Sequence, residues 1–272
     1  MYDECNIVAI TWARNEEDII ESFVRHNAPL VSRMVIILHR TEDSSLSILN
    51  KLREEGLNIE IRQDQSVAHR QSGALTDLMR ELMVEEKPDW ILPLDADEFL
   101  CGDLAGELKK VPAGQVVLLP WRTYIPTPDD DSCEISVLSR ITHCRTEEIP
   151  QYYKILIPQS LASDPNAVIP LGCHRLCGVD ASEYKEHGLS LAHFPVRSEK
   201  QLRNKILKGW ESHLANPDRK PGEIYQWKEL VGRCRDPKSI SKDELRDIAL
   251  DYAYKGETTT LKFSPICAEK SC

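Results

Sequence analysis

The sequence has little glycine, no long hydrophobic run and no excess of positive charge, and each shortage excludes a class of protein. Only 12 of its 272 residues are glycine, and no glycine-rich phosphate-binding loop follows the first expected strand. The longest apolar runs, such as Val35–Leu38 and Val116–Pro120, are far shorter than the ~20 residues of a membrane-spanning helix. The first residues are acidic and lack the pattern of a signal peptide. We therefore expect a cytoplasmic protein without a transmembrane segment.

The chain is acidic, with a formal net charge of −10 at pH 7. A protein that binds nucleic acid through its phosphates is expected to be basic, so we expect no nucleic-acid partner. An acidic chain that handles phosphorylated ligands needs a bound cation or a local cluster of arginine and lysine. Carboxylates able to hold a metal ion are therefore the feature of most interest.

Nine cysteines are scattered along the chain. An odd number without a signal peptide indicates reduced thiols in a cytoplasmic protein. The densest group combines Cys144, Cys173 and Cys177 with His143 and His174. It is a loose match to a zinc site, because Cys173 and Cys177 are spaced one residue too far apart for the usual pair of ligands. A structural zinc site and unligated thiols both stay open.

The first part of the chain alternates between apolar runs typical of buried strands and amphipathic runs typical of helices. Such alternation predicts an α/β fold with a mostly parallel, Rossmann-like sheet flanked by helices. In such sheets, ligands bind beyond the carboxyl ends of the strands. The expected strands are Asn6–Thr11, Met34–Leu38, Leu57–Arg62 and Asp89–Leu94, and the expected helices begin near Asn15, Ser44 and Ser72.

The second part of the chain is less regular. Strands are expected at Gln115–Pro120, Tyr153–Pro158 and Leu189–Phe194, and an amphipathic helix is expected at Ser198–Ala215. The basic residues of that helix are expected on a solvated face. Polar, helix-prone segments follow without repeats or low-complexity tracts. We therefore expect one continuous domain with a helical C-terminal extension.

An acidic motif directly follows the strand expected at Asp89–Leu94. In an extended segment, residues i and i+2 point to the same side, so Asp95 and Asp97 can converge at the carboxyl end of the strand. Two carboxylates repel each other unless a divalent cation such as Mg²⁺ or Mn²⁺ joins them, and such a cation keeps positions open for phosphate oxygens. The alternative is a solvated acidic turn.

Segments around this motif resemble family 2 glycosyltransferases of the GT-A fold, in particular a subgroup with an Asp-Ala-Asp-Glu-Phe core. The resemblance covers about residues 5–105, through the segments 9–17, 42–44 and 89–100, with scattered likeness at 190–198. It implies a nucleotide-diphosphate sugar as donor, a UDP- or GDP-sugar, and a hydroxyl of a glycan or other molecule as acceptor. It also implies a divalent metal cofactor, Mn²⁺ or Mg²⁺, and inversion of the anomeric centre.

The resemblance also divides the chain. It implies a GT-A catalytic domain at residues 1–197, made of a nucleotide-sugar-binding half (1–105) and an acceptor-side half (106–197). Residues 198–272 would form the helical extension, packed on the same domain. The sequence does not indicate an oligomeric state.

Ten residues are expected around the donor, most of them by the same resemblance; Lys154 is expected as a charge near the diphosphate, and His174 and Arg175, after a turn signal, could reach the diphosphate or the acceptor. Asn15 and Asp43 could instead cap helices, and Arg70, in the segment that approaches the diphosphate, could be a solvated side chain. His39 stands where the family carries an aspartate that reads the nucleobase. The ten residues are Thr11, Arg14, Asn15, His39, Asp43, Arg70, Asp95, Lys154, His174 and Arg175.

The resemblance further implies that Asp95, Asp97 and His193 bind the metal ion, although His193 could equally be a histidine packed in its strand. An inverting transferase also needs a general base for the acceptor hydroxyl. The sequence does not resolve which residue this is, and a solvated loop is the simpler explanation of the candidates. They are Asp129, Asp131 and Glu134.

These features together predict a metal-dependent glycosyltransferase of the hexosyltransferase type. Two alternatives stay open. A catalytically impaired sugar- or nucleotide-binding protein with the same fold is suggested by His39, which replaces the expected aspartate. A Mg²⁺-dependent nucleotidyltransferase would share the acidic motif, but the chain lacks the glycine-rich phosphate loop that such an enzyme often carries.

Overall fold

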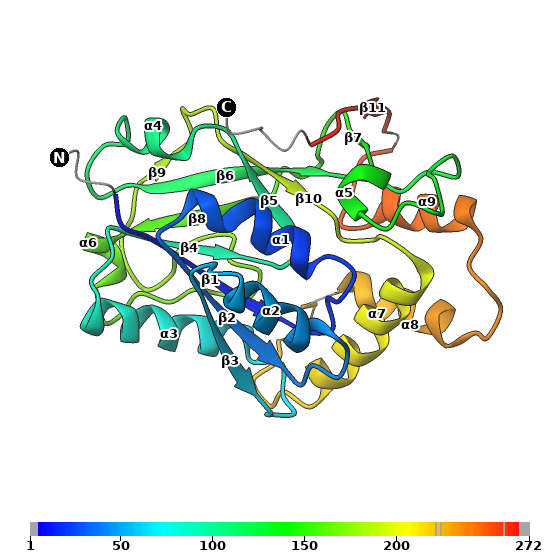
Figure 1. Cartoon of the computed structure of the whole chain (residues 1–272), viewed down its shortest axis with the longest axis horizontal. Helices are drawn as coiled ribbons and strands as arrows, with labels where there is room; N and C mark the ends of the chain where they lie inside the picture. The colour runs from blue at the N-terminus through cyan, green and yellow to red at the C-terminus, as the bar shows by residue number, and fades with distance from the viewer. Residues whose placement is uncertain (1–4, 221, 224, 258, 267–272) are drawn as a thin grey trace.

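The computed structural model describes residues 5–220, 222–223, 225–257 and 259–266 (Figure 1). Within these residues the central element is a nine-stranded mixed sheet with the order β3-β2-β1-β4-β8-β6-β10-β5, in which β9 pairs with β6 at the side. The strands are β1 (Ile7–Ala13), β2 (Arg33–His39), β3 (Ile59–Asp64), β4 (Trp90–Leu94), β5 (Glu98–Cys101), β6 (Val116–Thr123), β8 (Tyr153–Pro158), β9 (Glu183–Tyr184) and β10 (Ser190–His193).

Most neighbouring strands of the sheet run parallel. β1 pairs in parallel with β2 and with β4, and β2 pairs in parallel with β3. β8 is antiparallel to both β4 and β6, so β6 runs in the direction of β4. β10 is parallel to β6, and β5 closes the order as an antiparallel edge strand. The α/β class and the mostly parallel, helix-flanked sheet predicted from the sequence are confirmed.

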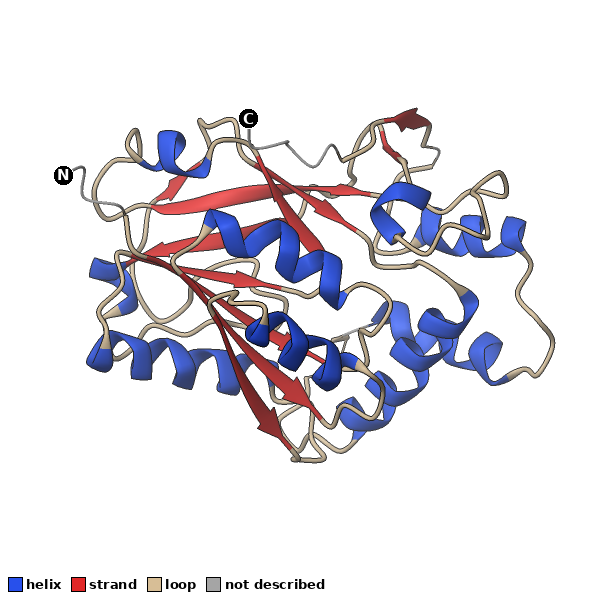
Figure 2. Ribbon diagram, in the orientation of Figure 1, coloured by secondary structure: helices blue, strands red, loops and turns tan. Residues whose placement is uncertain are grey.

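Helices cover both faces of the sheet (Figure 2). A short 3-10 helix, η1 (Ala28–Leu30), follows α1, and a separate two-stranded sheet pairs β7 (His143–Arg145) with β11 (Leu261–Phe263). The helices are α1 (Ile20–Asn27), α2 (Ser45–Glu54), α3 (Gln71–Glu85), α4 (Leu104–Leu108), α5 (Val137–Arg140), α6 (Gln159–Ala162), α7 (Glu199–Leu214), α8 (Tyr225–Arg235) and α9 (Lys242–Asp251).

The buried strand β1 explains why the sheet needs two layers of helices. Successive side chains of a strand point to opposite faces. Ala9 belongs to the apolar core shared with α1 and α2, whereas its neighbours Val8 and Ile10 belong to the core shared with α3. Because all seven residues of β1 are buried, both faces must be covered. This accounts for the near-continuous apolar pattern that predicted the strand.

The C-terminal helices build a third apolar core of their own. Leu202 and Ile206 of α7 pack there with residues of α8 and α9, such as Cys234 and Ala249. Buried Ile125 of the loop after β6 joins the same core, so the helices are anchored on the sheet side. How the chain divides into domains stays a prediction.

β1, β2 and β4 are parallel and therefore end at one edge of the sheet. In Figure 1, α7 and α8 lie beyond that edge. Polar side chains at the ends of these strands therefore face α7 and α8. Among the described residues, no helix has the length and apolar character needed to cross a membrane.

Candidate functional site

A cavity of about 360 Å³ lies at the carboxyl edge of the sheet, between the ends of β1, β2 and β4 and the helices α7 and α8. It is the place where the parallel topology predicts a ligand. Seven residues expected to bind the donor or the metal ion line it. They are Arg14, Asn15, His39, Asp95, Asp97, His174 and His193.

Asp95 follows the last residue of β4, and both of its carboxylate oxygens are engaged. Oδ2 accepts a hydrogen bond from Lys154 Nζ at 2.6 Å, and Oδ1 accepts one from Gln71 Nε2 at 2.9 Å. Lys154 is fully buried and also lies 3.5 Å from Glu98 Oε2. Burial alone would lower the pKa of Lys154, but the two carboxylates raise it, so the ammonium stays charged. Asp95 is therefore a fixed, neutralised group of the cavity wall.

Asp97 is in a different environment, because its two oxygens face different partners. Oδ2 accepts a hydrogen bond from Lys205 Nζ at 2.8 Å and lies 3.7 Å from Arg197 Nη1, whereas Oδ1 lies 3.8 Å from His193 Nε2. Burial would raise the pKa of Asp97, but the positive charges around it hold the pKa below its usual value. Asp97 is thus ionised.

Asp97 and His193 have the chemistry of a metal-binding pair. Burial lowers the pKa of His193 to about 3, so its ring is neutral, as a metal ligand must be. Its Nδ1 is buried without a hydrogen-bond partner. The described residues contain no group of three His, Cys, Asp or Glu side chains placed to hold a metal ion. Magnesium is often held by one or two carboxylates together with substrate phosphates, so this pair fits a divalent cation that takes further ligands from substrate and water.

Positive side chains gather on the helical wall opposite the strand ends. Lys205 and Lys208 of α7 line the cavity, and Arg14, after β1, lies against them. Arg14 Nη1 donates to the carbonyl oxygen of Lys208 at 3.1 Å and to Ser212 Oγ at 2.6 Å, which fixes it on the helix. Lys208 forms an ion pair with Glu42. In a chain that is acidic as a whole, these three cations form a local positive cluster of the kind that binds anions.

Aromatic rings line the end of the cavity near β1 and β2. Trp12 stacks on His39 with ring centroids 4.8 Å apart, and His69 meets Trp227 edge-on at 6.0 Å. Trp227 packs directly on Gly209 of α7, where any larger side chain would collide with its ring. His39 Nε2 lies 2.8 Å from the carbonyl oxygen of Ser66. A carbonyl only accepts, so Nε2 carries the proton and Nδ1 is the acceptor of the ring.

A second aromatic group lies at the β6 and β10 side. The Trp121 ring lies 4.3 Å from that of His193 and 5.2 Å from that of His174, and Tyr152 lies 5.3 Å from His174. His174 Nδ1 lies 2.8 Å from the carbonyl oxygen of Tyr153 and must donate to it, so the unprotonated nitrogen is Nε2. Burial lowers the pKa of His174, which keeps the ring neutral. The cavity thus contains a neutral imidazole able to accept a proton.

Several expected donor contacts lie elsewhere. Thr11 is fully buried inside β1, and its hydroxyl has no hydrogen-bond partner. Asp43 accepts hydrogen bonds from the backbone N–H groups of Glu17 and Ser45, so it joins the segment after β1 to the first residue of α2. Lys154 lies behind Asp95 and is not among the residues that line the cavity. Arg70 and Arg175 line a neighbouring cavity.

Asn15 lines the cavity but does not cap a helix, so that alternative is wrong. α1 begins at Ile20, and Asn15 adopts a left-handed backbone conformation with φ 55°. Its Oδ1 accepts a hydrogen bond from the N–H of Glu42. Asparagine tolerates this conformation better than most residues, and the bond ties the β1 end to the loop before α2.

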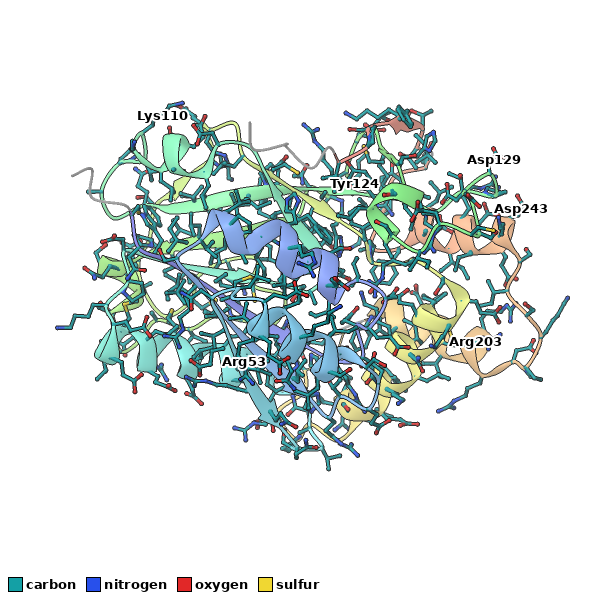
Figure 3. All side chains as sticks on the ribbon, in the orientation of Figure 1. Arg53, Lys110, Tyr124, Asp129, Arg203 and Asp243 are labelled. Atoms are coloured by element: carbon teal, nitrogen blue, oxygen red, sulfur yellow. The ribbon has the colours of Figure 1, made fainter. Side chains whose placement is uncertain are left out.

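The acidic loop expected to supply the general base lies away from the cavity. Figure 3 shows Asp129 at the periphery of the molecule, and Lys242 at the start of α9 donates to the carbonyl oxygens of Pro128 and Asp130. Asp131 and Glu134 accept hydrogen bonds from nearby backbone N–H groups of the same loop. None of the three expected residues is among the described residues that line the cavity. The side chains of Asp131 and Glu134 organise the loop.

Sequence reasoning missed the residues that α7 and α8 contribute. Lys205 was expected on a solvated face, yet it lines the cavity and holds Asp97. The spacing of Lys205, Lys208 and Gly209 places them on one side of the helix, and this was the available signal. Trp227 and His69 had no local signal, because their positions depend on how distant segments pack.

The cysteine group expected as a possible zinc site is dispersed. Cys144 is buried in the core shared with α1 and α2, and Cys173 is buried in the core shared with α3. Cys144, Cys173 and Cys177 are all unpaired thiols. The structure therefore gives no support for zinc binding by these three thiols.

No family model and no curated protein matches the chain. Structural likeness extends to S. aureus TarS 1–349, with 13% identity, 84% of this chain and 71% of that chain covered, and a TM-score of 0.42. A mannosyltransferase of Pyrobaculum calidifontis, PcManGT, in complex with GDP-Man and Mn²⁺ shares 11% identity over 90% of this chain and 72% of its own, with a TM-score of 0.44. GalNAc-T7 with UDP, GalNAc and Mn²⁺ shares 11% identity over 85% and 55% of the two chains, with a TM-score of 0.45. Likeness this distant assigns no activity.

Proposed function

We propose that this protein is a glycosyltransferase of the GT-A type that uses a nucleotide-diphosphate sugar. One observation carries the proposal: a single cavity at the carboxyl edge of the sheet joins the Asp97–His193 pair to the cations Arg14 and Lys205, with aromatic rings at both ends. Aromatic rings can hold the base and the sugar, and the cations with a bound metal ion can hold the diphosphate between them. The resemblance found in the sequence supports the same assignment.

The nucleobase is assigned to the end of the cavity formed by Trp12, His39 and Trp227. Planar rings suit a base because aromatic faces stack on one another. The Nδ1 of His39 accepts a hydrogen bond, so it suits a base with a ring N–H, as in uracil or guanine. In this proposal His39 takes the place of the aspartate that the resemblance led us to expect at the end of β2. Its acceptor nitrogen favours UDP- or GDP-sugars as donors.

The diphosphate is assigned to the space between Asp97 and the helical wall. Arg14 and Lys205 supply fixed positive charge where negative charge develops as the diphosphate departs. Asp97 and His193 would hold the divalent cation, Mn²⁺ or Mg²⁺. When bound, such a cation neutralises phosphate oxygens as a Lewis acid.

His174 is the general base that this geometry supports best. Its Nε2 takes the proton of the acceptor hydroxyl while the hydroxyl oxygen forms a bond to the anomeric carbon of the sugar. The bond from that carbon to the diphosphate oxygen breaks at the same time, and the nucleoside diphosphate leaves. Attack opposite to the leaving group inverts the anomeric centre.

The proposal is tested by calorimetric titration of UDP, GDP, CDP and dTDP, each with Mn²⁺ and with EDTA. We expect UDP or GDP to bind, with a contribution from Mn²⁺ that is lost in Asp97→Asn. Incubation with the matching nucleotide sugars should then release nucleoside diphosphate. Release of pyrophosphate would instead identify a nucleotidyltransferase, and binding without any release would identify a binding protein. Absence of nucleotide binding in every condition would refute the proposal.

A further inference from the structure

A second cavity, of about 560 Å³, adjoins the first. The two share His69, Gln71 and Leu171 as lining residues, so they are neighbours separated by one layer of side chains. Gln71 is fixed in this layer, because its Nε2 donates to Asp95 and its Oε1 accepts from the N–H of Gly172. A ligand in the second cavity therefore lies beside the reaction centre, outside the space assigned to the donor.

The second cavity is lined by three cations that have no acidic partner in the described part of the chain. Arg70, Arg175 and Lys220 are exposed, and the structure gives none of these side chains an ion pair or hydrogen bond with another described residue. Asp218 and Glu223 also line the cavity, so its charge is mixed with a positive excess. Because the chain as a whole has a net charge of −10, this positive excess is a local feature of the second cavity, and it favours an anionic ligand there.

A largely buried histidine also lines the same cavity. His213, near the end of α7, is only 5% exposed, and neither nitrogen of its ring has a hydrogen-bond partner among the described residues. Neither ring nitrogen is among the fully buried polar atoms that lack a partner, so both keep access to the cavity, where a ligand or water can complete their hydrogen bonds. α3 begins in the same cavity at Gln71 without a side-chain cap, and its first N–H groups add to the donors available there.

We propose that this second cavity binds a phosphate group carried by the acceptor substrate. The inference rests on the proposed function, since it places a phosphorylated acceptor beside the donor. Arginine guanidinium groups match the geometry of phosphate oxygens, and two of them with a lysine and the ring of His213 can enclose one phosphate. Arg70 then acts on the acceptor rather than on the diphosphate of the donor.

The test titrates inorganic phosphate into the full chain saturated with the nucleoside diphosphate that binds best. We expect phosphate to bind without displacing the nucleotide. In the double variant Arg70→Gln, Arg175→Gln, phosphate affinity should fall at least about tenfold, while nucleotide affinity stays unchanged. The matched control is Arg53→Gln on α2, an exposed arginine hydrogen-bonded to Asn50 (Figure 3). Chloride at equal ionic strength controls for screening.

Three results would overturn the inference while leaving the proposed function intact: phosphate that competes with the nucleotide, phosphate that does not bind, or equal binding by the double variant. If none of the nucleotides bound, both the inference and the proposed function would be overturned. The double variant is expected to fold, because both arginines are exposed and neither side chain is paired with another described residue. Retained nucleotide binding shows that it does.

Discussion

The two walls of the cavity are built in different ways. The strand wall places Asp95 directly after β4, Asp97 between β4 and β5, and His39 at the last position of β2, where the hydrogen-bonded sheet fixes the backbone. The helical wall places Lys205 and Trp227 on helices that contact the sheet through side chains. The strand wall supplies carboxylate and imidazole, and the helical wall supplies most of the positive charge.

The comparison shows how charge is divided in such a site. Asp97 of the strand wall and Lys205 of the helical wall form a direct ion pair, so removing either one leaves a largely buried charge without this partner. Arg197, between β10 and α7, adds a second link, since it binds Asp18 through two hydrogen bonds and also contacts Glu16. The following predictions separate the two walls, beginning with the largest effect.

His174→Asn should reduce turnover most. Asparagine can still donate to the carbonyl oxygen of Tyr153 but has no basic nitrogen, so we expect kcat to fall by about 10²–10⁴-fold. Nucleotide affinity, measured by calorimetry, should not change. The matched control is His187→Asn, because His187 also bonds a backbone carbonyl, that of Leu118. Equal losses in both variants would remove His174 from the mechanism.

Arg197→Met should have the largest effect on stability. Arg197 is fully buried, and its removal leaves Asp18 and Glu16 without their common partner. We expect a loss of about 3–5 kcal/mol in the free energy of unfolding, measured by urea denaturation. Arg53→Met, on the exposed face of α2, should cost far less. A loss below about 1 kcal/mol for Arg197→Met would show that the two walls are held together by other contacts.

The sequence predicted the strand wall far better than the helical wall. β1, β2 and β4 have clear apolar patterns, and the residue after a strand end has a defined place once the sheet is parallel. Asp97 was therefore identified from its place after the expected strand, and His39 from the family resemblance at the end of another expected strand. Trp227 reaches the cavity only because Gly209 leaves room for its ring, and a contact between residues so far apart has no periodic signal. The prediction of a general base in the acidic loop with Asp129 was wrong for a related reason. The composition of the loop suits catalysis, but the packing of distant segments places it away from the cavity.

Lys205→Met and Asp97→Asn should separate the nucleotide affinity measured without metal from the affinity added by Mn²⁺. Lys205→Met removes the charge of the helical wall, so binding measured in EDTA should weaken by about 10–100-fold. Asp97→Asn should abolish the additional nucleotide affinity that Mn²⁺ provides, because the Asp97–His193 pair loses its carboxylate. Lys200→Met, an exposed lysine at the start of α7, is the control for Lys205. If Lys205→Met instead removed only the Mn²⁺-dependent part, the roles of the two walls would be reversed.

His69 lies where the walls meet, and its titration should appear in the stability of the fold. Burial lowers the pKa of His69 to about 4, so the folded protein keeps the ring neutral. Between pH 6.5 and pH 4 the unfolded chain takes up a proton that the folded chain does not. The wild type should therefore lose about 1–3 kcal/mol relative to His69→Gln as the pH falls through this window. A difference that does not vary with pH would mean that His69 titrates normally.

Gly209→Ala should give the smallest effect, and it should appear in nucleotide affinity rather than in stability. Alanine favours a helix by roughly 0.8–1 kcal/mol over glycine, but at this position its methyl group collides with the Trp227 ring. The ring must move, so we expect little net change in stability and a loss of nucleotide affinity of about threefold to tenfold, the scale of one stacking contact. Gly232→Ala in α8 is the matched control, because its added methyl meets nothing within 4 Å. It should stabilise the protein and leave nucleotide binding unchanged. If both variants bound nucleotide as the wild type does, Trp227 would belong to the packing of the helical wall and not to the site.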